Sequence, residues 1–163
     1  ALALKETIDY WTGMSSKIKW PNDILINQKK IAGILIENKW RVNKNTVGII
    51  GIGLNINQTF FELLSATSIA SIIQTKVYHK DVLNTLTNRL NYWISDFDDA
   101  LLRLIQVEYD KSLYGFGKTI SLECAGMLKQ GSIIGVLENG ILQIELENEG
   151  IKEYDLDKIK ITY

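Results

Sequence analysis

The stretch KIKWPNDILINQKKIAGILIE, residues 17–37, is the part of the sequence around which the rest of the chain is organised. It holds the only proline, Pro21, whose ring fixes its own φ and pushes Trp20 toward an extended conformation. Asn22 and Asp23 favour a turn, because their short side chains can bond back to the nearby backbone. The stretch therefore opens with an extended segment and a turn.

Two apolar runs follow this turn and predict two strands. The first covers residues 24–26 and the second covers residues 31–37. The polar residues 27–30 between them form a break of hairpin length. Ala32 and Gly33 are small, so another group can approach the backbone of the second strand closely.

A third strand is predicted over residues 46–54, which include the run VGIIGIGL. This run is apolar almost without alternation, a pattern typical of a strand that is buried on both faces. On local sequence alone, Gly51 and Gly53 indicate nothing more than close strand packing. They are not a dinucleotide-binding fingerprint, because the third glycine is absent and no helix follows directly.

The motifs of this region resemble those of a known enzyme family. WPND at residues 20–23, followed by KKIAGILIE at residues 29–37, resembles the central signature of the biotin protein ligases. GIGLNIN at residues 51–57 resembles the glycine-rich strand of the same family, and the two blocks have the expected order and spacing. The resemblance covers most of the chain. It implies an α/β (α+β) ligase catalytic domain, built as a mixed sheet with helices, followed by a small SH3-like β-barrel.

Helical periodicity appears on both sides of this block. Apolar residues at helical spacing predict a helix over residues 1–14 that ends at Gly13. Ser65, Thr67 and Ser68 can each cap a helix N-terminus, and a short helix is predicted over residues 68–73. A single long helix is predicted over residues 81–110, with a core stripe formed by Leu83, Leu86, Leu90, Trp93, Phe97, Leu101 and Leu104.

A domain boundary is predicted near Tyr114. Residues 1–114 carry 13 basic and 11 acidic side chains, whereas residues 115–163 carry 5 and 8, together with seven of the twelve glycines. Asn139-Gly140 is a hairpin signal, and residues 142–147 alternate with period two. We therefore expect the catalytic domain in residues 1–114 and the barrel in residues 115–163.

Bulk composition narrows the classes of partner and compartment. The chain has 163 residues and a net charge of −1, so neither a nucleic-acid nor a membrane partner is expected. One cysteine, Cys124, excludes an intrachain disulfide and a thiolate metal site, and it fits the cytoplasm. No stretch approaches the roughly 20 apolar residues that cross a bilayer. The chain begins inside an amphipathic pattern, so it is expected to start partway through a domain.

The resemblance implies an activity: ATP-dependent ligation of biotin to a lysine of a biotin carboxyl carrier protein, through biotinyl-5′-adenylate and with Mg²⁺. Lys30 stands where the family has its essential lysine, before Ile31-Ala32-Gly33. A fixed ammonium beside the biotin carboxylate and the α-phosphate would stabilise charge that grows in both steps, and losing one such donor costs roughly 3–4 kcal/mol. Lys29 is its neighbour on the other face, so it is not expected to be the catalytic lysine.

The family pattern also gives the remaining site residues. Asp23 joins Lys30 as a catalytic residue, although both Asn22 and Asp23 are ordinary turn formers on local sequence alone. The resemblance assigns Asn22 and Asn55 to ATP, and it assigns biotin to Lys30, Gly33, Ile34, Gly51 and Gly53. No resident metal ion is expected. We interpret His79 as a solvated or capping residue and Cys124 as a small buried hydrophobe. Trp20 is interpreted either as a pocket wall or as a core residue.

Two other functions stay open. One is a lipoate- or octanoate-type acyl ligase of similar fold, and the other is a non-catalytic remnant that docks a carrier protein. The second is favoured by the absence of the family's G-R-G-R type loop, which the resemblance would place before Ala1. A homodimer also stays open, since strands that lack a neighbour would expose apolar surface.

Overall fold

The computed structural model describes residues 1–40, 46–95, 98–124, 126–156 and 158–162. Its strands form two antiparallel sheets. The first has the order β1-β2-β3-β4, and the second has the order β8-β7-β6-β5-β9. The strands of the first sheet are β1 (Lys17–Lys19), β2 (Asp23–Ile26), β3 (Lys29–Trp40) and β4 (Thr46–Leu54). The strands of the second are β5 (Thr119–Cys124), β6 (Met127–Val136), β7 (Leu142–Leu146), β8 (Gly150–Tyr154) and β9 (Ile159–Ile161).

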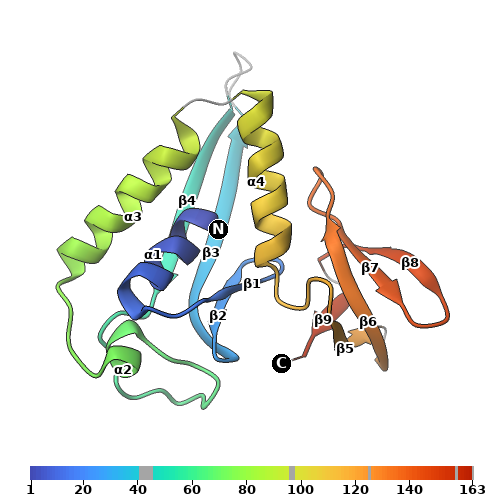
Figure 1. The fold of residues 1–163 in the computed structure, drawn as a ribbon, viewed down its shortest axis with the longest axis horizontal. Helices are drawn as coiled ribbons and strands as arrows, with labels where there is room; N and C mark the ends of the chain where they lie inside the picture. The colour runs from blue at the N-terminus through green and yellow to red at the C-terminus, as the bar shows by residue number, and fades with distance from the viewer. Residues whose placement is uncertain (41–45, 96–97, 125, 157, 163) are drawn as a thin grey trace.

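Helices are associated with the first sheet. They are α1 (Leu2–Thr12), α2 (Ile69–Ile73), α3 (His79–Ile94) and α4 (Asp99–Ser112). Figure 1 shows α1 between α3 and α4, with the second sheet beyond α4. None of the helices among the described residues is long and apolar enough to cross a membrane.

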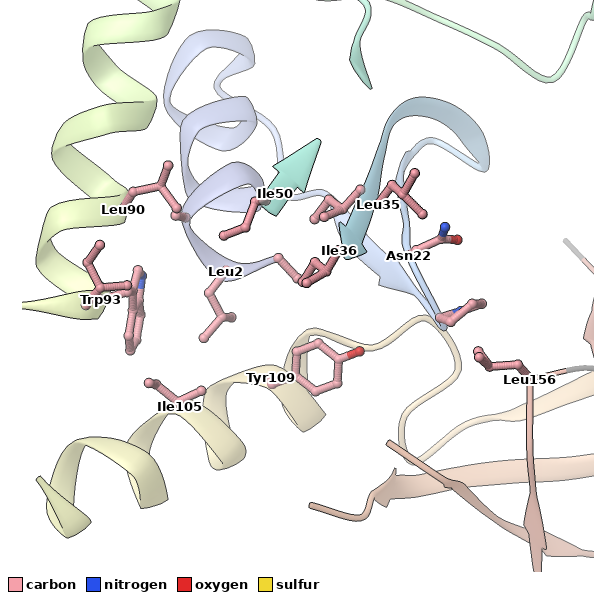
Figure 2. Close-up of a pocket in the computed structure, with 15 residues that line it drawn as sticks. Leu2, Asn22, Leu35, Ile36, Ile50, Leu90, Trp93, Ile105, Tyr109 and Leu156 are labelled. Atoms are coloured by element: carbon pink, nitrogen blue, oxygen red, sulfur yellow. The ribbon is translucent and has the colours of Figure 1, made fainter. Parts of the chain in front are cut away.

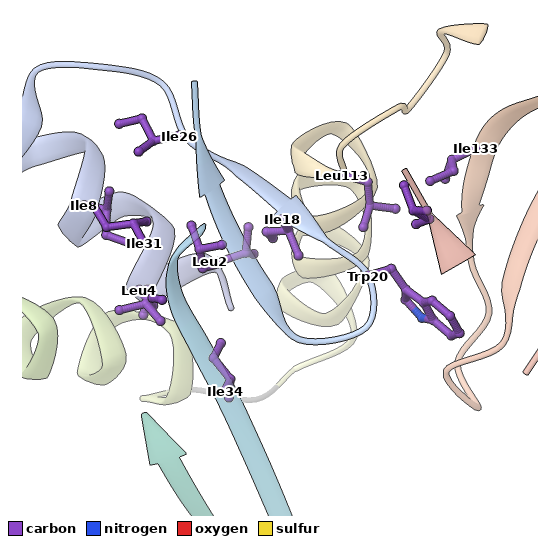
Figure 3. Close-up of a cluster of buried hydrophobic side chains, with 14 of the residues drawn as sticks. Leu2, Leu4, Ile8, Ile18, Trp20, Ile26, Ile31, Ile34, Leu113 and Ile133 are labelled. Atoms are coloured by element: carbon purple, nitrogen blue, oxygen red, sulfur yellow. The ribbon is translucent and has the colours of Figure 1, made fainter. Parts of the chain in front are cut away.

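The helix α1 confirms the first helical prediction. It ends before Gly13, whose positive φ of 67° lets the chain turn away while its N–H bonds to the Asp9 carbonyl. Leu4 and Ile8 project from α1 into the main cluster of buried apolar side chains, which includes Ile31 from the sheet (Figure 3). The helix therefore covers the inner face of the first sheet.

The β2–β3 hairpin is tighter than expected. Asn27 and Gln28 have φ values of 49° and 60°, so they form a two-residue turn, and β3 begins at Lys29 rather than after a four-residue break. Positive φ at both central residues matches the right-handed twist of the flanking strands. The prediction placed both lysines in the turn, whereas the structure places them in the strand.

A β-bulge follows the turn. Ile24 pairs with Ala32 and Leu25 pairs with Lys30, so Ile31 is an extra residue on β3. Ile31 is fully buried. The bulge therefore changes the alternation of side chains between Lys30 and Ala32.

The strand β4 has the predicted bounds, but the expectation that both of its faces are buried was wrong. Val47, Ile49 and Ile50 are all exposed. Within the described ranges β4 pairs only with β3 and forms the edge of the first sheet. An apolar run can indicate a strand, but it does not report how many neighbours cover that strand.

The prediction of a single long helix over residues 81–110 was also wrong, because the structure has the two helices α3 and α4 in its place. Asp98 caps the second one, α4, by accepting a hydrogen bond from the Leu101 N–H at 2.7 Å. Leu86 and Trp93 are buried as predicted, but Leu83 and Leu104 are exposed. The predicted stripe member Phe97 lies outside the described residues.

The second sheet confirms the period-two pattern of its strands. In β7 the side chains of Leu142, Ile144 and Leu146 are buried, and Cys124 is buried in β5 as expected. The helix α4 ends at Ser112 and β5 begins at Thr119. The boundary near Tyr114 and the SH3-like barrel both stay predictions.

Candidate functional site

Four residues of the first sheet lie in one row across its strands. Lys19 pairs with Asp23, Asp23 pairs with Gly33, and Gly33 pairs with Gly53. Residues directly opposite each other in a sheet share a face. The row therefore carries a cation, a carboxylate and two positions without side chains on the face opposite the helices.

Lys30 completes the ionic part of this site. Its Nζ lies 2.6 Å from Asp23 Oδ1, and the two side chains are 47% and 19% exposed. A Cβ atom built on Gly33 would lie 3.4 Å from Asp23 Oδ1 and 3.5 Å from Lys30 Nζ. A side chain at position 33 would therefore contact both members of the ion pair, whereas glycine leaves them beside the bare β3 backbone. Two residues that the sequence assigned to catalysis are in direct contact.

The backbone of Lys30 is fixed on its other side by a loop. Its N–H donates to the Ser65 carbonyl at 2.7 Å, and its carbonyl accepts from the Thr67 N–H at 2.9 Å. These bonds add a short parallel bridge at Ala66 beside β3. Lys29, by contrast, pairs with Ile26 next to the turn and is exposed.

Gly51 and Gly53 are not explained by packing within the protein. Gly53 pairs with Gly33 and Gly51 pairs with Leu35. The nearest atom to a Cβ on Gly51 would be the Leu35 carbonyl oxygen at 3.6 Å, and for Gly53 it would be the Gly33 carbonyl oxygen at 4.0 Å. Both distances are ordinary contacts. The three glycines therefore form a flat area on one face of β3 and β4, which we call the glycine floor: Gly33, Gly51 and Gly53.

Ile34 and Asn22 lie next to this floor, and the Ile34 side chain points away from it. The Ile34 N–H donates to the Asn22 carbonyl at 2.9 Å, so the backbones of the turn and of β3 are joined there. The side chain of Ile34 is buried in the core cluster, on the opposite face from Gly33. Ile34 thus borders the floor through its backbone, while the Asn22 side chain is exposed at the turn.

Asn55 follows the end of β4 and ties a loop to the sheet. Its side-chain Nδ2 donates to the Thr67 carbonyl at 3.0 Å, and its backbone N–H donates to the Ile31 carbonyl at 2.9 Å. Its own carbonyl accepts from the Ile69 N–H. Asn55 therefore supports the same loop that holds the Lys30 backbone.

Lys19 is the site residue that the sequence analysis missed. Partial burial lowers its pKa, the Lys30 ammonium lowers it further, and the Asp23 carboxylate opposes both effects. The signal was the hairpin itself: three turn residues after Lys19 place it opposite Asp23. Two ammonium groups around one carboxylate give this end of the row an excess of positive charge, which suits an anionic ligand.

A cavity lies outside the row, although the predicted site residues Asn22 and Ile34 contribute to its lining. It has a volume of about 650 Å³ and is bordered by Ile34, Leu35 and Ile36 of β3 and by the helices α3 and α4 (Figure 2). Its described lining is mostly apolar and includes neither Lys30, Asp23 nor any residue of the glycine floor. Burial and the nearby Asp110 raise the pKa of Tyr109, on its wall, to about 12. A neutral phenol in an apolar cavity cannot supply the charge that the row supplies.

Other reactive side chains are separate from the row. His79 is exposed at the first residue of α3, and Cys124 is buried in the second sheet. Among the described residues, no cluster of three histidine, cysteine, aspartate or glutamate side chains could hold a metal ion. The chemistry of the row therefore depends on its lysines, its carboxylate and the open glycine floor.

Comparison with known proteins supports the same region. A family model described as the biotin/lipoate A/B protein ligase family matches residues 1–55. The bifunctional ligase/repressor BirA of Bacillus subtilis is 31% identical over 158 residues, covering 94% of this chain and 48% of the relative. The chain thus spans about half the length of these curated relatives from Bacillus.

Solved structures extend the likeness to both sheets. The apo biotin protein ligase of Aquifex aeolicus matches with a TM-score of 0.77 and 26% identity, over 99% of this chain and 71% of that one. The Aquifex enzyme in complex with biotin and ATP matches with a TM-score of 0.75 and 24% identity, over 99% and 68%. The mixed α+β architecture with two antiparallel sheets is that of the biotin ligase catalytic domain. With the motifs, the fold and the relatives in agreement, this chain belongs to the biotin protein ligase family.

Proposed function

We propose that this protein activates biotin with ATP and transfers it to a lysine of a biotin carboxyl carrier protein. The observation that carries the proposal is the Lys30–Asp23 ion pair standing directly beside the glycine floor. It is supported by the family and by the Aquifex aeolicus relative that was solved with biotin and ATP. Because the chain spans half of its curated relatives, the proposal concerns the chemistry of this site within that family.

The glycine floor supplies room for the ligand. A Cβ on Gly51 or Gly53 would make only ordinary contacts with β3, at 3.6 Å and 4.0 Å, so these glycines are not required by packing and leave a flat backbone surface. The planar ureido ring of biotin can lie against such a surface, in contact with the backbone of Gly33 and Ile34. The Lys30 ammonium at the edge of the floor would then meet the negatively charged carboxylate.

Lys30 is proposed to act on both chemical steps. In the first, a carboxylate oxygen of biotin attacks the α-phosphorus of ATP and pyrophosphate leaves, so negative charge grows on the phosphorus oxygens. In the second, the neutral amine of the carrier lysine attacks the carbonyl carbon of the adenylate, the bond to AMP breaks, and the nitrogen releases one proton to solvent as the amide forms. A preorganised ammonium stabilises both transition states without transferring a proton. Asp23 holds the Lys30 ammonium in place through the 2.6 Å ion pair.

The nucleotide is proposed to contact Asn22 and Asn55. Asn22 offers an exposed amide beside Asp23 in the β1–β2 turn, and Asn55 lies at the end of β4 next to the loop that holds the Lys30 backbone. Mg²⁺ would arrive with the phosphates of ATP, which is how this ion commonly binds. We further propose that residues 115–163 form an SH3-like domain beyond Tyr114, and that the protein acts in the cytoplasm.

A lipoate- or octanoate-type ligase is the second candidate. Its support is the family model, whose description includes both biotin and lipoate ligases. Calorimetric titration with biotin, lipoate and octanoate separates the two, since the proposed function requires tightest binding of biotin. A chain that only docks a carrier would bind none of the three acids.

The test of the proposed function compares two adjacent lysines. Lys30→Ala removes the ammonium beside Asp23, whereas Lys29→Ala removes an exposed ammonium one residue away. With biotin, ATP and Mg²⁺, pyrophosphate release should fall about 100-fold for Lys30→Ala, the scale expected for a preorganised charge. Lys29→Ala should have a much smaller effect, and equal losses would reject the assignment.

A further inference from the structure

One hydrogen bond connects the site turn to the second sheet. The indole Nε1 of Trp20 donates to the backbone carbonyl of Gly140 at 3.1 Å, across 120 residues of sequence. Trp20 is 4% exposed, and Figure 3 shows its ring pointing from the β1–β2 turn away from Ile18 and toward the second sheet. Trp20 therefore links the β1–β2 turn of the first sheet to the β6–β7 hairpin of the second sheet.

The far end of this bond is held firmly. Gly140 lies in the β6–β7 hairpin, which is closed by the Leu137 N–H donating to the Ile141 carbonyl at 2.9 Å. The helix α4 braces the base of the hairpin at Val136. Gln106 Nε2 donates to the Val136 carbonyl at 2.7 Å, and the Val136 N–H donates to Asp110 Oδ1 at 3.1 Å. The carbonyl that Trp20 reaches thus belongs to a hairpin that is fixed at its base.

The near end of the bond lies close to the ion pair. Trp20 is separated from Asp23 only by Pro21 and Asn22, and the Asn22 carbonyl accepts the Ile34 N–H. The preceding strand is held too, since the Tyr114 N–H donates to the Ile18 carbonyl at 2.7 Å. A displacement of the indole must therefore be taken up in the short turn that presents Asp23 to Lys30.

We propose that Trp20 is a positioning residue, through which the β6–β7 hairpin of the second sheet holds Asp23 against Lys30. Trp20 is joined to Asp23 through Pro21 and Asn22, so we expect it to act through the turn. The kinetic consequence rests on the proposed function, but the mechanical connection does not. Loss of the connection lets the Asp23 carboxylate move, and the Lys30 ammonium then loses its fixed direction.

Two variants break the connection from opposite ends. Trp20→Phe removes the indole N–H and keeps an aromatic ring. Gly140→Val alters the hairpin alone: Gly140 has a φ of 87°, which a β-branched residue resists, so the carbonyl must shift. Gly150→Val is the matched control. Gly150 has a φ of 70° on the same sheet, and neither glycine has any atom within 4 Å of a built Cβ.

Hydrogen exchange of the Ile34 amide gives a direct reading of the turn, because this N–H is bonded to the Asn22 carbonyl. Exchange should be about tenfold faster in Trp20→Phe and in Gly140→Val, the effect of weakening one such hydrogen bond, and unchanged in Gly150→Val. In the ligase assay the first two variants should lower kcat about tenfold while KM for biotin stays within twofold.

Two results would overturn the proposal. One is equal exchange at Ile34 in Gly140→Val and Gly150→Val, which would mean that the hairpin does not reach the turn. The other is unchanged exchange in Trp20→Phe. If the parent protein shows no ligase activity, the proposed function fails, yet the exchange measurement still decides whether the two sheets are coupled.

Discussion

Replacing Gly53 by alanine separates the two explanations of the glycine floor. If the glycine serves strand packing, a methyl group there should disturb the sheet. The nearest atom to the new Cβ is the Gly33 carbonyl oxygen at 4.0 Å, so the structure has room for the methyl group. Alanine also loses less conformational entropy than glycine on folding. The free energy of unfolding should therefore rise, by roughly 0.5–1 kcal/mol.

Ligand binding should change in the opposite direction. The methyl group of Gly53→Ala would stand on the floor beside Gly33 and lift any molecule that lies against the backbone. Inserting a methyl group into a close contact costs about 1–3 kcal/mol, which corresponds to biotin binding that is roughly 5- to 150-fold weaker. A protein that becomes more stable and binds less tightly is a signature of a binding surface.

The assays are urea unfolding followed by circular dichroism and calorimetric titration with biotin. Gly48→Ala is the control in the same strand, since Gly48 pairs with Asn38 far from the row; among the residues that the structure describes, its Cβ would meet Asn38 Oδ1 alone, at 3.4 Å. It should leave biotin affinity unchanged. The reasoning is refuted if Gly53→Ala binds biotin as tightly as the parent, or if it unfolds more easily.

Three further changes test other parts of the structure. The pKa of Tyr109 is raised from 10.0 to about 12, so its stabilising contribution is complete below pH 10 and disappears as pH rises through 12. Between pH 9 and pH 11, the free energy of unfolding in urea should therefore fall less in Tyr109→Phe than in the parent. Equal losses in the two proteins would contradict this. Asp98→Ala removes the N-cap of α4 and should cost about 1 kcal/mol in thermal unfolding, while Asp98→Asn should retain most of it. Ile49→Lys places a charge on the exposed edge strand β4 and should reduce the self-association of the parent in light scattering; a parent that is monomeric at all concentrations would reject this expectation.

The local parts of the fold were accessible from sequence because each has a local cause. Gly13 ends α1 since it accepts a positive φ, and Ser68 caps α2 by accepting the Ser71 N–H. The break between α3 and α4 was missed because apolar spacing continues across it, and the capping aspartate carries the only signal. The exposure of β4 was missed because an apolar run looks the same whether one neighbour covers it or two.

The candidate site was predictable in composition but not in geometry. The motif identified Lys30 and Asp23, and the structure brings their charged groups to 2.6 Å. Lys19 and Trp20 joined the account only when the pairing of β1 and the position of the second sheet were known. The partner of Trp20 lies 120 positions away, and no local pattern reports such a partner. Lys19 depends instead on the pairing of β1 with β2, which places it opposite Asp23.

The two-residue turn at Asn27 and Gln28 has a consequence for how this protein can vary. Loop lengths on protein surfaces usually tolerate insertion, but this loop determines which of two consecutive lysines faces Asp23. One added residue would shift β3 by one position against β2 and carry Lys30 to the other face. The length of this turn therefore determines whether Lys30 can pair with Asp23. We expect substitutions here to be tolerated far better than insertions or deletions.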